Sequence, residues 1–193
     1  MAKEKKINIK EVIIVTVTLT LICLITTALL AIVNNVTEEP IKQNVIKAEN
    51  EARMSVVEGA SDFVEKDGGA YYEAVDANGN VIGYAVSTSA KGYGGDVSVM
   101  TGFDMKGRIL KVEIVSAGDE TPGLGQNITK DSFLGQFVGK SGELKLVTAS
   151  QSTGADNEID AVTSATYSSV AVVDAVNEAR EILSFIGEVT DNE

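Results

Sequence analysis

The sequence reads Asp160-Ala161-Val162-Thr163-Ser164-Ala165-Thr166 directly before a segment with the hydrophobic periodicity of an amphipathic helix. Further hydroxyls follow at Ser168 and Ser169. A helix N-terminus offers unpaired backbone N–H groups and the positive end of the helix dipole, which together favour a phosphate group. Helix capping needs only one hydroxyl, from Thr163 or Thr166. The excess of hydroxyls favours a phosphate site, in which a threonine hydroxyl could also be esterified.

Composition excludes several kinds of catalytic site. The 193 residues include no His and one Cys, so the chain lacks the commonest general base and cannot form an internal disulfide or a Cys-ligated metal site. We therefore expect no catalytic side chain and no metal site, and chemistry that comes from a cofactor. A net charge of −12 argues against nucleic acid as a partner, because phosphate contact needs Lys and Arg.

An uncharged apolar stretch covers residues 12–33 and predicts a transmembrane helix, because such a segment is about 33 Å long and a bilayer core is about 30 Å thick. Lysines precede it and Glu38 and Glu39 follow it. The positive-inside rule therefore places residues 1–11 in the cytoplasm and the bulk of the chain outside. The stretch is too long for a cleaved signal peptide, and Ile22 before Cys23 argues against a lipoprotein signal.

The rest of the chain predicts an α+β domain. Helical spacing from Pro40 to about Val64 predicts a helical connector over residues 34–66, which Asp67-Gly68-Gly69 breaks. Two hairpins, a closing helix and short elements follow within a domain over 67–187, before a polar tail over 188–193. The fold class is a twisted, mainly antiparallel sheet with flanking helices. The expected elements are strands 71–75, 81–87, 96–105, 109–115 and 144–147, and helices 132–137 and 168–186.

Two glycine-containing motifs lie within this domain. In Glu120-Thr121-Pro122-Gly123-Leu124-Gly125 a tight turn is followed by a second glycine, so the backbone could approach a flat ligand. In Lys91-Gly92-Tyr93-Gly94-Gly95 the glycines indicate a bulge or a close backbone contact, and Tyr93 could cover an aromatic ring. Taken separately, each is more typical of an ordinary turn or loop.

The order of the membrane span and the three motifs is that of a known family. The chain resembles the G subunits of Rnf electron-transport complexes and, more distantly, the C subunits of sodium-pumping NADH:quinone reductases, which share an FMN-binding domain. The resemblance covers essentially the whole chain. It implies that FMN is attached through its phosphate to Thr166 by a separate flavin transferase, which uses FAD and magnesium. The other cofactor-binding residues that it implies are Thr163, Ser164, Ala165, Asp160, Glu120, Thr121, Leu124, Gly125 and Tyr93.

The resemblance also implies individual roles for some of these residues. Asp160 would serve recognition by the transferase, and Thr121, Leu124 and Gly125 would line the flavin. Two residues depart from the family pattern, Ser164 in place of Gly and Gly118 in place of a frequent His.

The implied function is an electron relay in the cytoplasmic membrane, beside the other Rnf subunits. The complex would move electrons between ferredoxin and NAD, coupled to Na⁺ or H⁺ translocation. Two alternatives are a stand-alone membrane-anchored flavin reductase of a small extracellular acceptor and a non-enzymatic surface or sensor domain.

Overall fold

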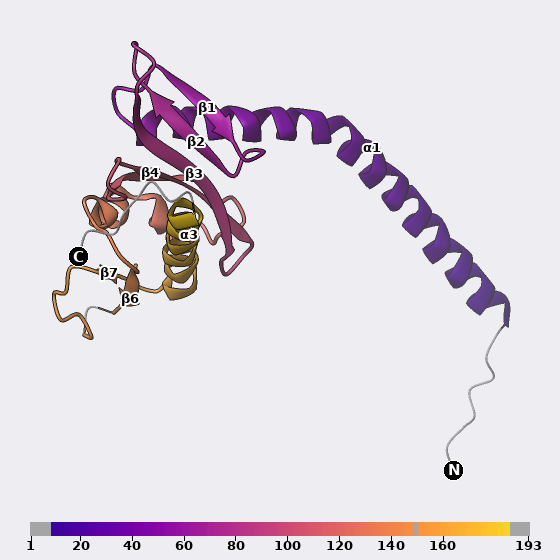
Figure 1. Cartoon of the computed structure of the whole chain (residues 1–193). Helices are drawn as coiled ribbons and strands as arrows, with labels where there is room; N and C mark the ends of the chain where they lie inside the picture. The colour runs from indigo at the N-terminus through magenta and orange to yellow at the C-terminus, as the bar shows by residue number, and fades with distance from the viewer. Residues whose placement is uncertain (1–8, 149, 186–193) are drawn as a thin grey trace. The chain divides into compact units, whose positions relative to one another are not determined.

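The computed structural model describes residues 9–148 and 150–185 (Figure 1). The chain divides into two compact units, Met1–Asn44 and Val45–Glu193. Helix α1 (Ile9–Val56) begins in the first unit and ends in the second. Within it lies an apolar section whose side chains are exposed to the surroundings, and this section is long and apolar enough to cross a membrane.

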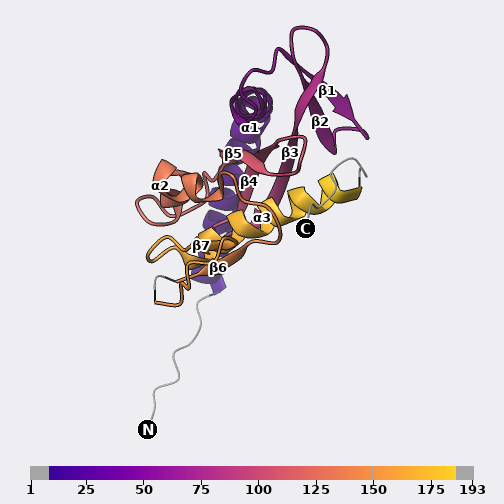
Figure 2. The same ribbon diagram turned by 60° about the vertical axis from the view of Figure 1, so that its left-hand side comes forward.

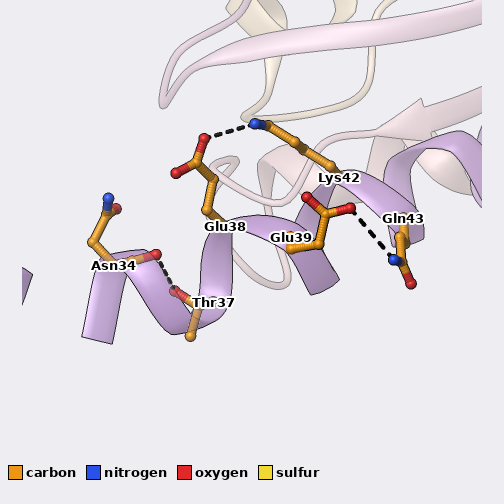
Figure 3. Close-up of polar contacts among 6 residues, drawn as sticks. All are labelled: Asn34, Thr37, Glu38, Glu39, Lys42 and Gln43. Carbon is orange, nitrogen blue, oxygen red and sulfur yellow. Dashed lines mark hydrogen bonds and ion pairs between the residues drawn. The ribbon is translucent and has the colours of Figure 1, made fainter. Parts of the chain in front are cut away.

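Threonines in the apolar section bond their own helix. The hydroxyls of Thr16, Thr18, Thr20 and Thr26 each donate to a carbonyl of the preceding turn at 2.8–3.0 Å, so these polar groups are compatible with a lipid-facing helix. Beyond the apolar section the helix surface becomes charged. Lys42 forms an ion pair with Glu38 at 2.6 Å one turn earlier (Figure 3).

The predicted end of the helical connector is wrong. Helix α1 continues through Pro40 but ends at Val56, eight residues before the expected Val64, and strand β1 (Asp62–Lys66) follows. Gly59 has φ +88°, a left-handed conformation that commonly ends helices. Each residue of β1 then pairs antiparallel with strand β2. The second half of the predicted connector is therefore part of the sheet.

The main sheet is a five-stranded antiparallel meander in the order β1-β2-β3-β4-β5. Both predicted hairpins are confirmed, the first around Asp76 and the second around Asp104. Bonds from the side chain and backbone of Asn80 hold the pKa of Asp76 below its ordinary value. The remaining strands are β2 (Tyr71–Val75), β3 (Val81–Lys91), β4 (Asp96–Phe103) and β5 (Ile109–Ser116).

Helices cover both faces of this sheet. Helix α3 (Thr166–Phe185) packs against β3 and β4 (Figures 1 and 2). The last residues of α1 pack on the opposite face against Met100 and Ala85. The expected apolar face of α3 is confirmed at Val172, Val176, Ala179 and Leu183, whereas Ile186 and the tail over 188–193 lie outside the described residues.

Short elements connect the meander to α3. They are the 3₁₀ turns η1 (Gly125–Thr129) and η2 (Gly135–Phe137), helix α2 (Asp131–Leu134), and strands β6 (Lys145–Val147) and β7 (Glu158–Asp160). The predicted helix over 132–137 and strand over 144–147 correspond to α2 with η2 and to β6. Strand β7, which pairs parallel with β6, was not expected. The α+β class with a mainly antiparallel sheet is confirmed.

Candidate functional site

A cleft of about 410 Å³ lies where three loops meet the N-terminus of α3. The loops are the glycine-rich loop after β3, the turn after β5 and the segment before α3. The cleft brings together eight of the ten predicted site residues, together with Tyr167 and Ser168, which were not among them. Its lining consists of Tyr93, Glu120, Thr121, Leu124, Gly125, Ser164, Ala165, Thr166, Tyr167 and Ser168.

The N-terminus of α3 is formed without the expected threonine cap. Helix α3 begins at Thr166, so Ala165 stands at the cap position. The hydroxyl of Ser169 ties the preceding segment to the first turn, because it accepts from the Val162 N–H at 3.0 Å and donates to the Ala165 carbonyl at 2.9 Å, but it bonds none of the N–H groups that begin the helix. The expectation that Thr163 or Thr166 caps the helix is therefore wrong.

Donors remain free at this helix end. Among the described residues, no acceptor faces the backbone N–H groups of Thr166, Tyr167 and Ser168, as is usual in a first helical turn. The hydroxyl of Thr166 also makes no hydrogen bond there, and the residue is exposed in the cleft. This arrangement suits an anion, and it leaves a threonine hydroxyl accessible for covalent modification.

Ser164 lies on the cleft wall just before helix α3 begins, and its backbone is strained. Ser164 has φ +65°, in the left-handed region that disfavours residues with a Cβ atom. Glycine would adopt this conformation without that cost, which gives a physical reason for the glycine that the resemblance implies at this position. The serine keeps the turn, and its side chain lines the cleft.

Exposed apolar side chains gather at the cleft. Tyr93 from the glycine-rich loop is 73% exposed and Tyr167 from α3 is 72% exposed, and their ring centroids lie 6.5 Å apart. Leu124 from the turn after β5 is also exposed. Large apolar side chains that converge on a concave site are typical of a surface for a planar aromatic ligand.

Glu120 occupies the inner wall of the cleft and is only 2% exposed. Its Oε2 accepts from the hydroxyl of Ser168 at 2.5 Å, and its Oε1 accepts from the Gly94 N–H at 3.1 Å. A Cβ atom on Gly92 or Gly125 would come within 2.4 Å of these oxygens. Both carboxylate oxygens are thus used by the protein itself, and glycine is required around them.

Asp160 and Thr163 are not brought into this cleft. They line a second hollow of about 370 Å³, together with Lys130 and Gln136. The side-chain amide of Gln136 bonds the backbone N–H of Asp160 at 2.8 Å and its carbonyl at 3.2 Å. The sequence run from 160 to 166 therefore divides between two surfaces, with its first residues in one hollow and its last residues in the other.

Comparisons with known proteins match this arrangement. A family model described as "FMN-binding domain" matches residues 92–181, which include every residue of the cleft, and one described as "RnfG N-terminal region" matches residues 1–56. The G subunit of the proton-translocating ferredoxin:NAD(+) oxidoreductase complex of Clostridium ljungdahlii is 34% identical over 97% of this chain and 99% of its own length. The G subunit of an ion-translocating oxidoreductase complex of Methanosarcina acetivorans is 34% identical over 91% of this chain and 96% of its own length.

A solved structure shares the fold. NqrC of Shewanella oneidensis superposes with a TM-score of 0.53 at 21% identity, covering 71% of this chain and 72% of that chain. The identity over nearly the full length and the match of the N-terminal region decide the family. This chain belongs to the family of G subunits of Rnf ion-translocating oxidoreductase complexes, and it is an electron-transport subunit with an FMN-binding domain.

Proposed function

We propose that this chain is an electron relay that carries FMN as a phosphoester on Thr166, in a complex that moves electrons between ferredoxin and NAD and translocates Na⁺ or H⁺. The observation that carries the proposal is the unpaired Thr166 hydroxyl, exposed in the cleft at the N-terminus of α3. The Clostridium relative is named as proton-translocating, and a relative from Acetobacterium woodii, 34% identical over 79% of this chain, as Na(+)-translocating. The proposal therefore includes both ions.

The residues of the cleft fit FMN. Its volume of about 410 Å³ lies within the usual range for small-molecule sites. The free N–H groups of the first α3 turn suit the phosphate, and the exposed surfaces of Tyr93, Tyr167 and Leu124 suit the ring system. When bound, the flavin supplies the redox chemistry, so the chain only has to hold and orient it.

The attachment step uses Thr166 once, during maturation. The Oγ1–phosphorus bond would form as the pyrophosphate bond of FAD breaks, with AMP as the leaving group and loss of the threonine hydroxyl proton. A separate flavin transferase with magnesium would carry this out, and the exposure of Thr166 supports access by such an enzyme. Asp160 is exposed in the neighbouring hollow, which supports its role in recognition by the transferase rather than in flavin contact.

The test of the attachment site is the fluorescence of the denatured chain. With the transferase present, the unmutated protein gives a flavin-fluorescent gel band, and Thr166→Ala abolishes it. Thr129→Ala is the matched control, because this threonine is also exposed but lines neither hollow; its band remains. A fluorescent Thr166→Ala band, or a bare polypeptide mass for the unmutated chain, would refute the attachment.

We propose that residues 1–11 lie in the cytoplasm, that residues 12–33 span the bilayer, and that the flavin domain lies outside. The charge distribution around the apolar section supports this orientation. A membrane-impermeant maleimide should label Asn78→Cys in intact cells, because Asn78 lies in the exposed hairpin turn. The native Cys23 lies in the apolar section and serves as the unlabelled control. Labelling of Asn78→Cys only after lysis would reverse the orientation.

A further inference from the structure

The buried carboxylate of Glu120 ties together the three segments that form the cleft. Glu120 itself belongs to the turn after β5. Its Oε1 accepts a hydrogen bond from Gly94 in the loop after β3, and its Oε2 accepts one from Ser168 in the first turn of α3. Ser168 stands two residues after Thr166 in the same turn. The side chain therefore fixes the glycine-rich loop and the attachment turn relative to each other.

The position requires two acceptor atoms. Gly94 and Ser168 both donate to the side chain, each to a different oxygen. A glutamine has one acceptor oxygen and one NH₂ group, so it would turn a donor toward one of these two donors. Substitution by an isosteric amide would thus leave a buried donor unpaired.

The charge of this carboxylate has no cationic partner in the described part of the chain. The described cleft lining contains no Lys or Arg, and none of the ion pairs between described residues involves Glu120. A buried negative charge that is balanced only by dipoles exerts its field over a longer range than an exposed charge, because water does not screen it. Adding electrons to a group in the same cleft is then opposed.

We propose that Glu120 is a positioning residue that fixes the geometry of the cleft and places a negative charge in its wall, which lowers the reduction potential of the flavin bound there. This inference rests on the proposed function. It assigns Glu120 a role that rests on the bonds its two oxygens accept from Gly94 and Ser168, and not on a bond to the flavin.

The test is a spectroelectrochemical titration of the full-length, flavin-loaded protein in detergent. In Glu120→Gln, the ratio of reduced to oxidised flavin at the wild-type midpoint rises about tenfold, which is about 30 mV for a two-electron couple. That size is expected for a unit charge within about 12 Å at the effective dielectric of a protein. The matched control is Asp119→Asn, which removes the same charge from the exposed neighbouring residue and changes the ratio less than about twofold.

Ser168→Ala provides a second variant that keeps the charge. Loss of the shorter hydrogen bond leaves the carboxylate less neutralised, so the potential falls, opposite in sign to the shift in Glu120→Gln. If Glu120→Gln does not fold or load flavin, Ser168→Ala alone tests whether Glu120 affects the reduction potential of the flavin. The inference is overturned by an unchanged or raised potential in Ser168→Ala, or by equal shifts in Glu120→Gln and Asp119→Asn. Absence of gel fluorescence from the unmutated chain would instead reject the attachment to Thr166.

Discussion

A methyl group at Gly125 would strike the carboxylate that holds the cleft together. The Cβ atom of Gly125→Ala would lie 2.4 Å from Oε2 of Glu120 and 3.0 Å from Oγ of Ser168. Because real Cβ atoms essentially never come within 3.0 Å of a heavy atom, one of the groups must move by at least about 0.6 Å. The carboxylate cannot swing away freely, since both of its oxygens are bonded and the side chain is buried.

The cost follows from the bonds that this movement breaks. A hydrogen bond to a charged group contributes about 1.5–3 kcal/mol, and here one is lost and the other lengthened. Replacement of glycine also lowers the conformational entropy of the unfolded chain, which raises the free energy of unfolding by about 0.5 kcal/mol. We expect Gly125→Ala to lower the free energy of unfolding by about 2–3 kcal/mol, or the melting temperature by about 4–12 °C.

Thermal unfolding of the flavin-free chain measures this, followed by the near-ultraviolet circular dichroism of the buried Tyr71 and Tyr84. Gly118→Ala is the control, because its Cβ would meet no atom within 4 Å, and it should change stability by less than about 0.5 kcal/mol. In a Glu120→Ala background the clashing oxygen is gone, so Gly125→Ala should cost only about 0.5 kcal/mol, a coupling of about 2 kcal/mol. Equal costs in both backgrounds would show that the carboxylate is not the obstacle.

Two further predictions concern the sheet behind the cleft. Gly102→Ala should lower the free energy of unfolding by about 2–3 kcal/mol, because its Cβ would lie 2.2 Å from the Val56 carbonyl oxygen and would lift the end of α1 from the sheet. The same thermal unfolding assay measures this change. An unchanged free energy of unfolding would contradict the packing of α1 on the sheet. Thr101→Val should raise the free energy of unfolding by about 1 kcal/mol, since the buried Thr101 hydroxyl has no hydrogen-bond partner among the described residues. Calorimetry measures this change, and a lower stability of the variant would indicate that a water molecule binds the hydroxyl.

Local sequence signals predicted the elements whose formation is decided locally. The hairpin around Asp76 was predicted because an Asp whose carboxylate bonds the backbone of Asn78 and Asn80 makes its turn without help from the rest of the chain. Strand β1 was missed because helical spacing continues past Gly59, and only pairing with β2 makes residues 62–66 a strand. Strand β7 has three residues and a parallel partner, so tertiary structure alone decides it.

The features of the site also divide into those that local sequence predicts and those that only tertiary structure decides. The three motifs singled out from the sequence supply the three segments that meet at the cleft. The sequence could not show that Ser169 would bond the segment before the helix while no threonine caps it, because both patterns place hydroxyls at plausible spacing. Tyr167 could have been found from its place next to Thr166 in the first turn of α3, on the same side as the cleft. The burial of Glu120 depends on a glycine of its own turn and on glycines of the distant loop after β3.

The composition of the cleft gives a physical reason for the proposed covalent attachment. A phosphate held there would be met by helix N–H groups and by no described Lys or Arg, so its binding would rest on a dipole interaction of about 0.3–1 kcal/mol and a few hydrogen bonds. The two tyrosines on the cleft are mostly exposed, and the nearest buried charge, on Glu120, repels an anion. On the proposed outer side of the membrane, a dissociated flavin would be diluted and lost. The proposed bond to Thr166 would make the local concentration of the flavin permanent, and it would let the chain use weak contacts for positioning and a negative wall for setting the potential.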